Sequence, residues 1–225
     1  AVAVVDPHRP DCPYPFKEMA GVGVALKLVC ALDTDRAQKN GEDTALAVEA
    51  ILKEYADLAA IGTVADVMPL VDENRFIVSE GIKLIEARHR LGVSALVDAA
   101  SGAKEGKEAR TVDATFIGFG IAPRINAAGR MENASVAVEL MLADDAETAR
   151  AVAEYLCEIN RTRQTVENAI IEEALERIYD EHDLRRDKVI VLADDGWNHG
   201  VIGIVASRLV EKFSMPTILV TFDGT

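Results

Sequence analysis

The apolar and polar positions along the first half of the chain alternate between short apolar runs and stretches with helical spacing. In chain order, this pattern predicts a strand over residues 1–5, a helix from near residue 15 to 32, a polar surface loop over 33–43, a helix over 45–55, a buried strand over 58–66 that ends in an acid, a helix over 72–88 and an exposed loop over 101–110. Such alternation of strand and helix is typical of an α/β layer built on a parallel sheet.

One long amphipathic segment dominates the second half of the chain. Apolar residues keep roughly one face from about residue 145 to 179, and Asp144 and Glu147 are spaced as a capping box at its start. A helix of that length would span on the order of 50 Å, which is longer than a compact domain needs, so we expect it to connect two domains. The pattern of strand, helix and strand over residues 188–194, 200–213 and 216–222 then predicts a βαβ unit.

Composition narrows the class of protein without fixing it. The net charge of -14 and the pI of about 4.7 argue against a uniformly basic nucleic-acid-binding surface, although a local basic groove can lie on an acidic body. We find no apolar window long enough for a membrane span and no signal peptide. The three cysteines form no CxxC pair, which favours a reducing cytoplasm over a disulfide framework or a zinc site. The abrupt ends lead us to expect a piece of a longer protein.

Asp66 is the first candidate for chemistry. It follows the apolar run at the position where the predicted strand should end, and reactive groups gather at the carboxyl ends of strands in open α/β sheets. A carboxylate at this position can ligate Mg²⁺ or Mn²⁺. The alternative interpretation is that Asp66 only caps the next turn or helix.

A second group of candidates lies in residues 122–131, where Arg124 and Arg130 flank Asn126 in an apolar segment of small residues. Arginine makes bidentate contacts to phosphate, and Gly129 with its alanine neighbours would allow close approach of a ligand. Alternatively, an arginine here pairs with a carboxylate and braces a loop. Local sequence does not decide between the two.

Two further pairs of residues are weaker candidates for binding nucleic acid. Arg161 and Arg163 lie two apart on the long helix, where the alternative is a solvated helix face. Trp197 and His199 lie at a strand-to-helix turn, where free N–H groups at the start of the helix attract anions and an aromatic ring could stack on a base. The alternative is that Trp197 fills core and His199 lies at the surface. Because no nucleophile motif is present, any hydrolysis would rest on metal-activated water.

The order of these motifs resembles the RecJ-type exonucleases of the DHH/DHHA1 phosphoesterase family. Residues 14–28 (YPFKEMAGVGVALKL) resemble the segment after the DHH motif, residues 62–75 (GTVADVMPLVDENR) the last metal-ligand motif, residues 122–131 with the NRTRQ helix the linker, and residues 196–209 (GWNHGVIGIVASRL) the entry to the DHHA1 domain. The resemblance implies three regions, namely the C-terminal part of a DHH domain over 1–110, a linker with the long helix over 111–184, and the N-terminal part of a DHHA1 domain over 185–225.

The resemblance also implies a function. RecJ-like enzymes hydrolyse single-stranded DNA from 5′ to 3′ with two divalent cations, Mn²⁺ or Mg²⁺, and act in DNA repair and recombination. Asp66 matches the last ligand aspartate, and Arg124, Asn126 and Arg130 match the strand-contacting linker motif. His199 and Arg208 lie in the matching DHHA1 segment, which helps to hold the strand in the family. Together with Arg161, Arg163 and Trp197, these are the residues that we expect to contact nucleic acid.

Two departures qualify that function. The family's other ligands would precede Ala1, so we expect these 225 residues alone to bind no metal and to be inactive. The family commonly has His after the Trp, where this chain has Asn198. Two other functions stay open. The parent protein could be a RecJ-like scaffold or binding protein that has lost its activity, or a DHH phosphodiesterase acting on short oligonucleotides or cyclic dinucleotides.

Overall fold

The computed structural model describes residues 4–102 and 111–222, and the chain divides into two compact units. The first unit comprises residues 1–123 and 140–153, and the second comprises residues 124–139 and 154–225. The described residues form a mostly helical α/β fold with one small parallel sheet. Across these residues, every helix is too short or too polar to span a lipid bilayer.

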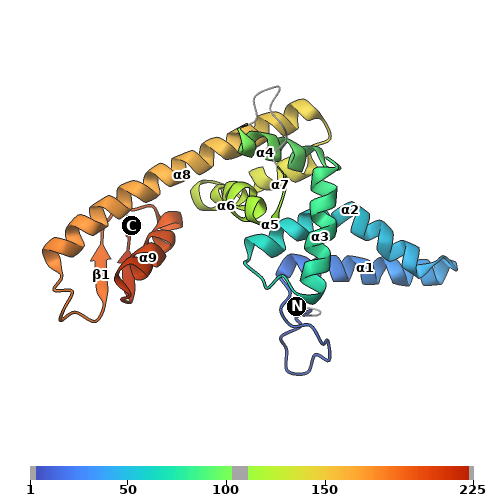
Figure 1. The fold of residues 1–225 in the computed structure, drawn as a ribbon, viewed down its shortest axis with the longest axis horizontal. Coiled ribbons are helices and arrows are strands. Elements are labelled where there is room, and N and C mark those ends of the chain that lie inside the picture. Colours follow the sequence, from blue (N-terminus) through green and yellow to red (C-terminus); the bar gives the residue numbers. More distant parts are fainter. Residues whose placement is uncertain (1–3, 103–110, 223–225) are drawn as a thin grey trace. The chain divides into compact units, whose positions relative to one another are not determined.

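The first unit is built from helices (Figure 1). In chain order they are α1 (Gly21–Asn40), α2 (Thr44–Ala65), α3 (Asp72–Glu86), α4 (Leu91–Ser101), the short α5 (Ala114–Phe116) and the π-helix η1 (Ile117–Ile121). Helix α2 packs against α1, α3 and η1. The backbones of α2 and α3 approach so closely that a Cβ on Gly81 would lie 2.2 Å from the carbonyl oxygen of Ala56. Glycine at this position therefore sets the spacing of the two helices.

The surface loop predicted over residues 33–43 is wrong for most of its length, because α1 continues to Asn40. Arginine, lysine and glutamine are good helix formers despite their polarity, as is alanine, and pairs such as Lys39 with Asp35 support the exposed face. The helix stops only at Gly41, whose left-handed backbone (φ 71°) lets its N–H bond the carbonyls of the last turn.

The buried strand predicted over residues 58–66 is also wrong, because this segment is the second half of α2. A buried helix segment and a buried strand both appear as continuous apolar runs, so periodicity does not separate them. Ala59, Ala60, Ile61 and Thr63 are all buried, which explains why no polar face interrupts the run. Val4 and Val5 are not in a strand either. Residues 1–3 and 103–110, on which the rest of the first strand and most of the loop over 101–110 were predicted, lie outside the described residues.

The second half of the chain follows the sequence pattern closely. After α6 (Ala122–Met131) and α7 (Ser135–Leu142), the long helix α8 runs unbroken from Ala146 to Glu181, which confirms the predicted long helix. The cap lies one residue later than predicted, since the side chain of Asp145, not Asp144, accepts a hydrogen bond from the backbone N–H of Thr148 (2.8 Å). The start of α8 therefore carries the polar group that its unpaired N–H groups need.

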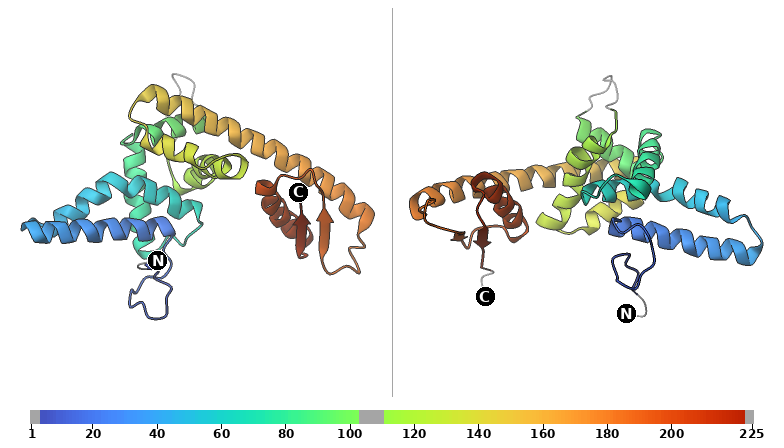
Figure 2. Two further views of the ribbon diagram at one scale, coloured as in Figure 1. Left: turned by 180° about the vertical axis from the view of Figure 1, so that it is seen from behind. Right: turned by 60° about the horizontal axis from the view of Figure 1, so that its bottom comes forward.

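The predicted βαβ unit is confirmed in the second unit. Strand β1 (Ile190–Ala193) pairs in parallel with β2 (Thr217–Val220), with Ile190 opposite Thr217 and Ala193 opposite Val220. Helix α9 (His199–Phe213) connects them and packs against β2, as the view from behind in Figure 2 shows. A two-stranded sheet is marginal alone, so its stability depends on the apolar faces of α8 and α9.

Candidate functional site

Asp66 lies at the C-terminal end of helix α2, not at the end of a strand. Its backbone N–H bonds the carbonyl oxygen of Gly62 (3.0 Å), and its side chain is exposed. The C-terminal end of a helix carries partial negative charge, so a carboxylate here adds to a negative potential that favours a cation. Asp66 is thus accessible to a metal ion, although the element that presents it differs from the one we predicted.

The turn beyond Asp66 holds a backbone conformation that costs energy. The N–H of Met68 bonds the carbonyl oxygen of Thr63 (3.2 Å) and that of Val67 bonds Val64 (3.0 Å), which is the Schellman pattern of a helix end. The left-handed position of this motif is usually glycine, but here it is Val67, with φ 56° and 87% of its surface exposed. Left-handed backbone at a β-branched residue is uncommon, and strain of this kind concentrates at functional sites.

The side chain of Asn74 holds the backbone after this turn in place through hydrogen bonds. It is fully buried in α3, and its side-chain amide donates to the backbone carbonyls of Pro69 (3.0 Å) and Glu18 (2.5 Å). Next to it, Glu73 binds both Lys27 and the hydroxyl of Tyr14. Burial alone would raise the pKa of Glu73, but its contacts with Lys27 and Tyr14 outweigh burial and hold the pKa below its ordinary value.

A metal ion needs more ligands than Asp66 supplies. Each divalent cation takes about six oxygen or nitrogen ligands, several of them from the protein. Within residues 4–102 and 111–222, no three His, Cys, Asp or Glu side chains come together in an arrangement that could hold a metal ion. The described residues therefore do not by themselves form a complete metal site, and Asp66 is a single potential ligand.

Helix α6 presents the arginine motif on different faces. Arg124 is half-buried, and its Nε lies 3.1 Å from Sγ of the buried Cys157 on α8. Asn126 and Arg130 are exposed, and Arg130 also donates to the carbonyl oxygen of Gly200 at the start of α9 (3.2 Å). The guanidinium groups are thus held to α8 and α9, which orients them without excluding a phosphate contact.

The small residues of this motif differ in exposure. Ala127 and Ala128 are fully buried and pack in the interior, whereas Gly129 is exposed, so close approach of a ligand remains a prediction for Gly129. The close approach that glycine permits here is between helices, because a Cβ on Gly200 would lie 2.0 Å from the carbonyl oxygen of Arg130. Any larger residue at 200 would force α6 and α9 apart.

Arg163 does not face solvent. Its guanidinium is buried on α8, where it pairs with the buried Glu167 and donates to the side-chain oxygen of Asn160 (2.9 Å). Glu167 also pairs with Nε of Arg208 on α9 (2.7 Å). This burial argues against the predicted nucleic-acid contact of Arg163, since only 11% of its side chain is exposed and its guanidinium is already paired. Arg161 is exposed, 3.3 Å from Glu158.

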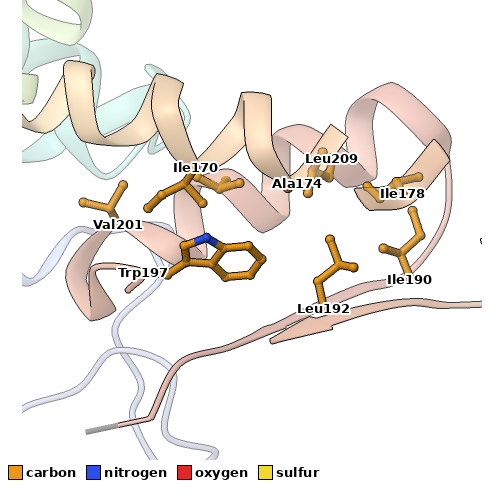
Figure 3. Close-up of a cluster of buried hydrophobic side chains, with 9 residues drawn as sticks. Ile170, Ala174, Ile178, Ile190, Leu192, Trp197, Val201 and Leu209 are labelled. Carbon is orange, nitrogen blue, oxygen red and sulfur yellow. The ribbon is translucent and has the colours of Figure 1, made fainter. Parts of the chain in front are cut away.

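Trp197 belongs to the apolar core of the second unit. Figure 3 shows its ring between α8 and the β1–α9 segment, among Ile170, Leu192 and Val201. The ring is 4% exposed and its Nε1 donates to Glu173 (3.1 Å). The stacking role predicted for Trp197 is contradicted, because the ring has no open face for a base.

The residues after Trp197 form the start of α9. The side chain of Asn198 accepts a hydrogen bond from the backbone N–H of Gly200 (2.9 Å) and caps the helix. Asn198, which departs from the family pattern, is thus a normal capping residue. His199 is the first residue of α9 and is exposed, whereas Arg208, whose side chain is 54% exposed, is tied to Glu167 through one edge.

Comparison with known proteins identifies the relatives of the chain. No family model matches it. The single-stranded-DNA-specific exonuclease RecJ of Bacillus subtilis strain 168 is 40% identical over 221 residues, which are 98% of this chain and 25% of the relative. RecJ of Escherichia coli K12 is 37% identical over 97% of this chain and 37% of the relative. The crystal structure of RecJ with Mg²⁺ from Thermus thermophilus superposes with a TM-score of 0.75 at 38% identity, covering 94% of this chain and 30% of that one.

The chain matches a central region of RecJ. A RecJ structure bound to manganese gives a similar result, with a TM-score of 0.74 at 38% identity over 94% of this chain and 49% of that one. The chain spans between a quarter and two fifths of the length of the curated RecJ relatives described above. The matched RecJ structures hold Mg²⁺ or Mn²⁺, which supports the use of a divalent metal in this group of proteins.

Sequence reasoning missed the residues that hold the RecJ-type motifs in place. Three of them are buried polar residues with 0–3% exposure, namely Asn74, Asn160 and Glu167. The fourth is Glu173, which accepts a hydrogen bond from Trp197. One signal was available, since Glu167 lies four residues after Arg163 on a helix, the spacing of a favourable pair. The contacts of Asn74 with Glu18 and of Glu173 with Trp197 span 56 and 24 positions and left no local signal.

Proposed function

We propose that the protein containing this chain is a single-strand-specific exonuclease that degrades DNA from 5′ to 3′ with two divalent cations, Mn²⁺ or Mg²⁺. Identity of 40% over 98% of the chain to a protein named a single-stranded-DNA-specific exonuclease is the observation that carries this proposal. The proposal extends to a cytoplasmic enzyme of DNA repair and recombination whose partner is single-stranded DNA. Protein partners are left open.

Within this function, the chain supplies one metal ligand and part of the strand-binding surface. Asp66 is the proposed ligand, because its carboxylate is exposed at the negative end of α2. Arg124, Asn126 and Arg130 on α6, with Arg161, His199 and Arg208, are the proposed DNA contacts. Arginine suits this task because its planar guanidinium binds phosphate oxygens in pairs. The acidic chain favours contacts concentrated at such points over a broad basic face.

The test is hydrolysis by the full-length protein. A single strand labelled at its 5′ end should release labelled mononucleotide at once in Mn²⁺, whereas a 3′-labelled strand should release its label only when degradation is complete. Double-stranded DNA of the same sequence and the same reaction in EDTA are the controls. Asp66→Asn removes one ligand charge at constant shape and should abolish the release. Strand binding without hydrolysis would favour a RecJ-like binding protein, and cleavage of cyclic dinucleotides alone would favour the smaller phosphodiesterases.

A further inference from the structure

Phe119 is the most exposed aromatic side chain among the described residues, at 83%. It lies at the centre of the π-helix η1, between Gly118 and Gly120. The other large apolar residues of this helix, Ile117 and Ile121, are fully buried, so the segment is anchored in the core of the first unit. A π-helix is rare and is frequently found at functional sites. The buried Ile117 and Ile121 therefore fix the backbone of η1, and the side chain of Phe119 extends from it into solvent.

The two glycines beside Phe119 have different reasons to be there. A Cβ on Gly120 would lie 2.7 Å from the ring of Phe116, so packing demands glycine at that position. A Cβ on Gly118 would meet only Val64, at an ordinary 3.5 Å, so packing does not demand glycine there. The accessibility of the Phe119 ring therefore follows from its own exposure of 83% and not from these glycines.

The position of η1 relates Phe119 to the candidate metal ligand. Helix η1 packs against α2, and Gly118 faces Val64 in the last turn of that helix. Asp66 follows Val64 by two residues. The exposed ring therefore lies on the element that packs against the end of α2 from which Asp66 projects, within the same compact unit.

We propose that Phe119 is a base-stacking platform that binds a nucleobase of single-stranded DNA beside the Asp66 end of α2. This inference rests on the proposed function and adds a specific base contact to it. Unpaired bases expose flat π faces, and aromatic side chains that stack on them are a general device of single-strand binding. Within η1 the ring is the single exposed large side chain, since its neighbours there are glycine or buried. Val67, just beyond the end of α2, is also exposed, so the experiment includes a comparison that separates a base contact from a general apolar contact.

The experiment compares two oligonucleotides on variants of the full-length protein, in EDTA so that no strand is cleaved. One is a fluorescein-labelled oligo(dT), and the other has the same backbone with abasic sites. Phe119→Ala should weaken oligo(dT) binding by about 5- to 150-fold, the range that loss of one stacked base gives. Binding to the abasic strand should change by less than about 2-fold, because the contact is to the base and not to the phosphate.

Two further variants separate stacking from apolar burial. Phe119→Trp should keep or increase the affinity for oligo(dT), whereas Phe119→Leu should behave as Phe119→Ala because it lacks a π face. Melting temperatures of all three should stay near that of the parent, since the ring is exposed. Equal weakening on both strands, full affinity of the Leu variant, or a lower melting temperature of the Ala variant would overturn the inference.

The outcomes also separate this inference from the proposed function. Base-dependent binding by an unsubstituted protein that does not hydrolyse the strand in Mn²⁺ would sink the exonuclease proposal and leave the stacking role intact. Unchanged oligo(dT) affinity in Phe119→Ala, with hydrolysis intact, would sink the stacking role alone. If the unsubstituted protein does not bind oligo(dT) at all, both are overturned.

Discussion

Arg163 and Glu167 form a buried ion pair one turn apart on α8, in a chain that is acidic as a whole. Glu167 is 1% exposed and also receives Arg208 from α9, while Asn160 accepts a hydrogen bond from Arg163. Two arginines on one carboxylate leave the group with a net positive charge. The pairing therefore ties α8 to α9 and presents the free edge of Arg208 at the surface.

Arg163→Met should destabilise the protein strongly. Removing one partner leaves the buried carboxylate of Glu167 with a single exposed partner, which typically costs about 3–5 kcal/mol. Urea unfolding followed by circular dichroism measures the change. The matched control is Arg161→Met, two residues away and exposed, which should change the free energy of unfolding by less than about 0.5 kcal/mol. Equal effects of the two substitutions would show that the pair is not a structural element.

Arg124→Ala in the full-length protein should weaken single-strand binding more than it destabilises the fold. A charge-assisted contact to phosphate contributes on the order of 1.5–3 kcal/mol, and its loss should lower the salt slope by roughly 0.7 on a single strand. Affinity should fall for all base sequences alike. The contact of Arg124 with Cys157 makes a bracing role the competing explanation. A melting temperature lower by several degrees with an unchanged salt slope would establish bracing instead.

The contact between α6 and α9 predicts opposite results for two glycines on one helix. Gly200→Ala places a methyl group 2.0 Å from a backbone carbonyl and should destabilise by about 1–3 kcal/mol, the usual cost of overpacking. A Cβ on Gly203 meets nothing within 4 Å, so Gly203→Ala should stabilise α9 by up to about 1 kcal/mol. Differential scanning calorimetry of both variants tests the pair, and destabilisation by both would contradict the close approach.

Lowering the pH should reduce the free energy of unfolding of the first unit, because Glu73 becomes protonated. Its pKa is held below the ordinary 4.5, with burial opposed and outweighed by Lys27 and Tyr14. The stability from this depressed pKa is fully present above the ordinary value and is lost as the pH falls through the lower, folded-state value. In Glu73→Gln, the fall in unfolding free energy below about pH 4.5 should be smaller than in the unsubstituted protein.

A surface carboxylate provides the control for this pH effect. Glu49 pairs with Lys53 on α2 with both side chains mostly exposed, and such pairs contribute little. Glu49→Gln should therefore leave the acid limb of the stability curve unchanged. If both variants flatten it equally, general charge repulsion in acid is the cause rather than the Glu73 contacts.

The parts of the fold that could be predicted from the sequence are those with a clear period or a local signal. The long helix follows from amphipathic spacing, and the βαβ unit follows from the two short apolar runs on either side of a helical segment. The second half of α2 could not be predicted as a helix, because a helical segment that is buried on all sides lacks the polar face that marks an amphipathic helix. Because this segment was expected to be a strand, Asp66 was expected at a strand end. It lies instead at the end of a helix, where its side chain is exposed.

Prediction of the candidate site failed where burial decides the role. Nothing local shows that Trp197 is covered by α8 or that Arg163 points inward, because both facts depend on residues that meet only in the fold. The exposed positions Arg130, Asn126 and His199 remain as predicted contacts. Phe119 carried no signal, since an apolar residue in an apolar run is expected to be buried.

Trp197 also gives the second unit an optical signature of its own. It is the single tryptophan of the chain, and it is buried against Ile170 and Val201 with its indole N–H bound to Glu173. Its fluorescence should shift to longer wavelength when this core opens, and unfolding confined to α1–α4 should leave the emission unchanged. Excitation at the tryptophan band therefore reports one unit, while circular dichroism reports both. Any gap between the two transition midpoints would measure how far the units unfold separately.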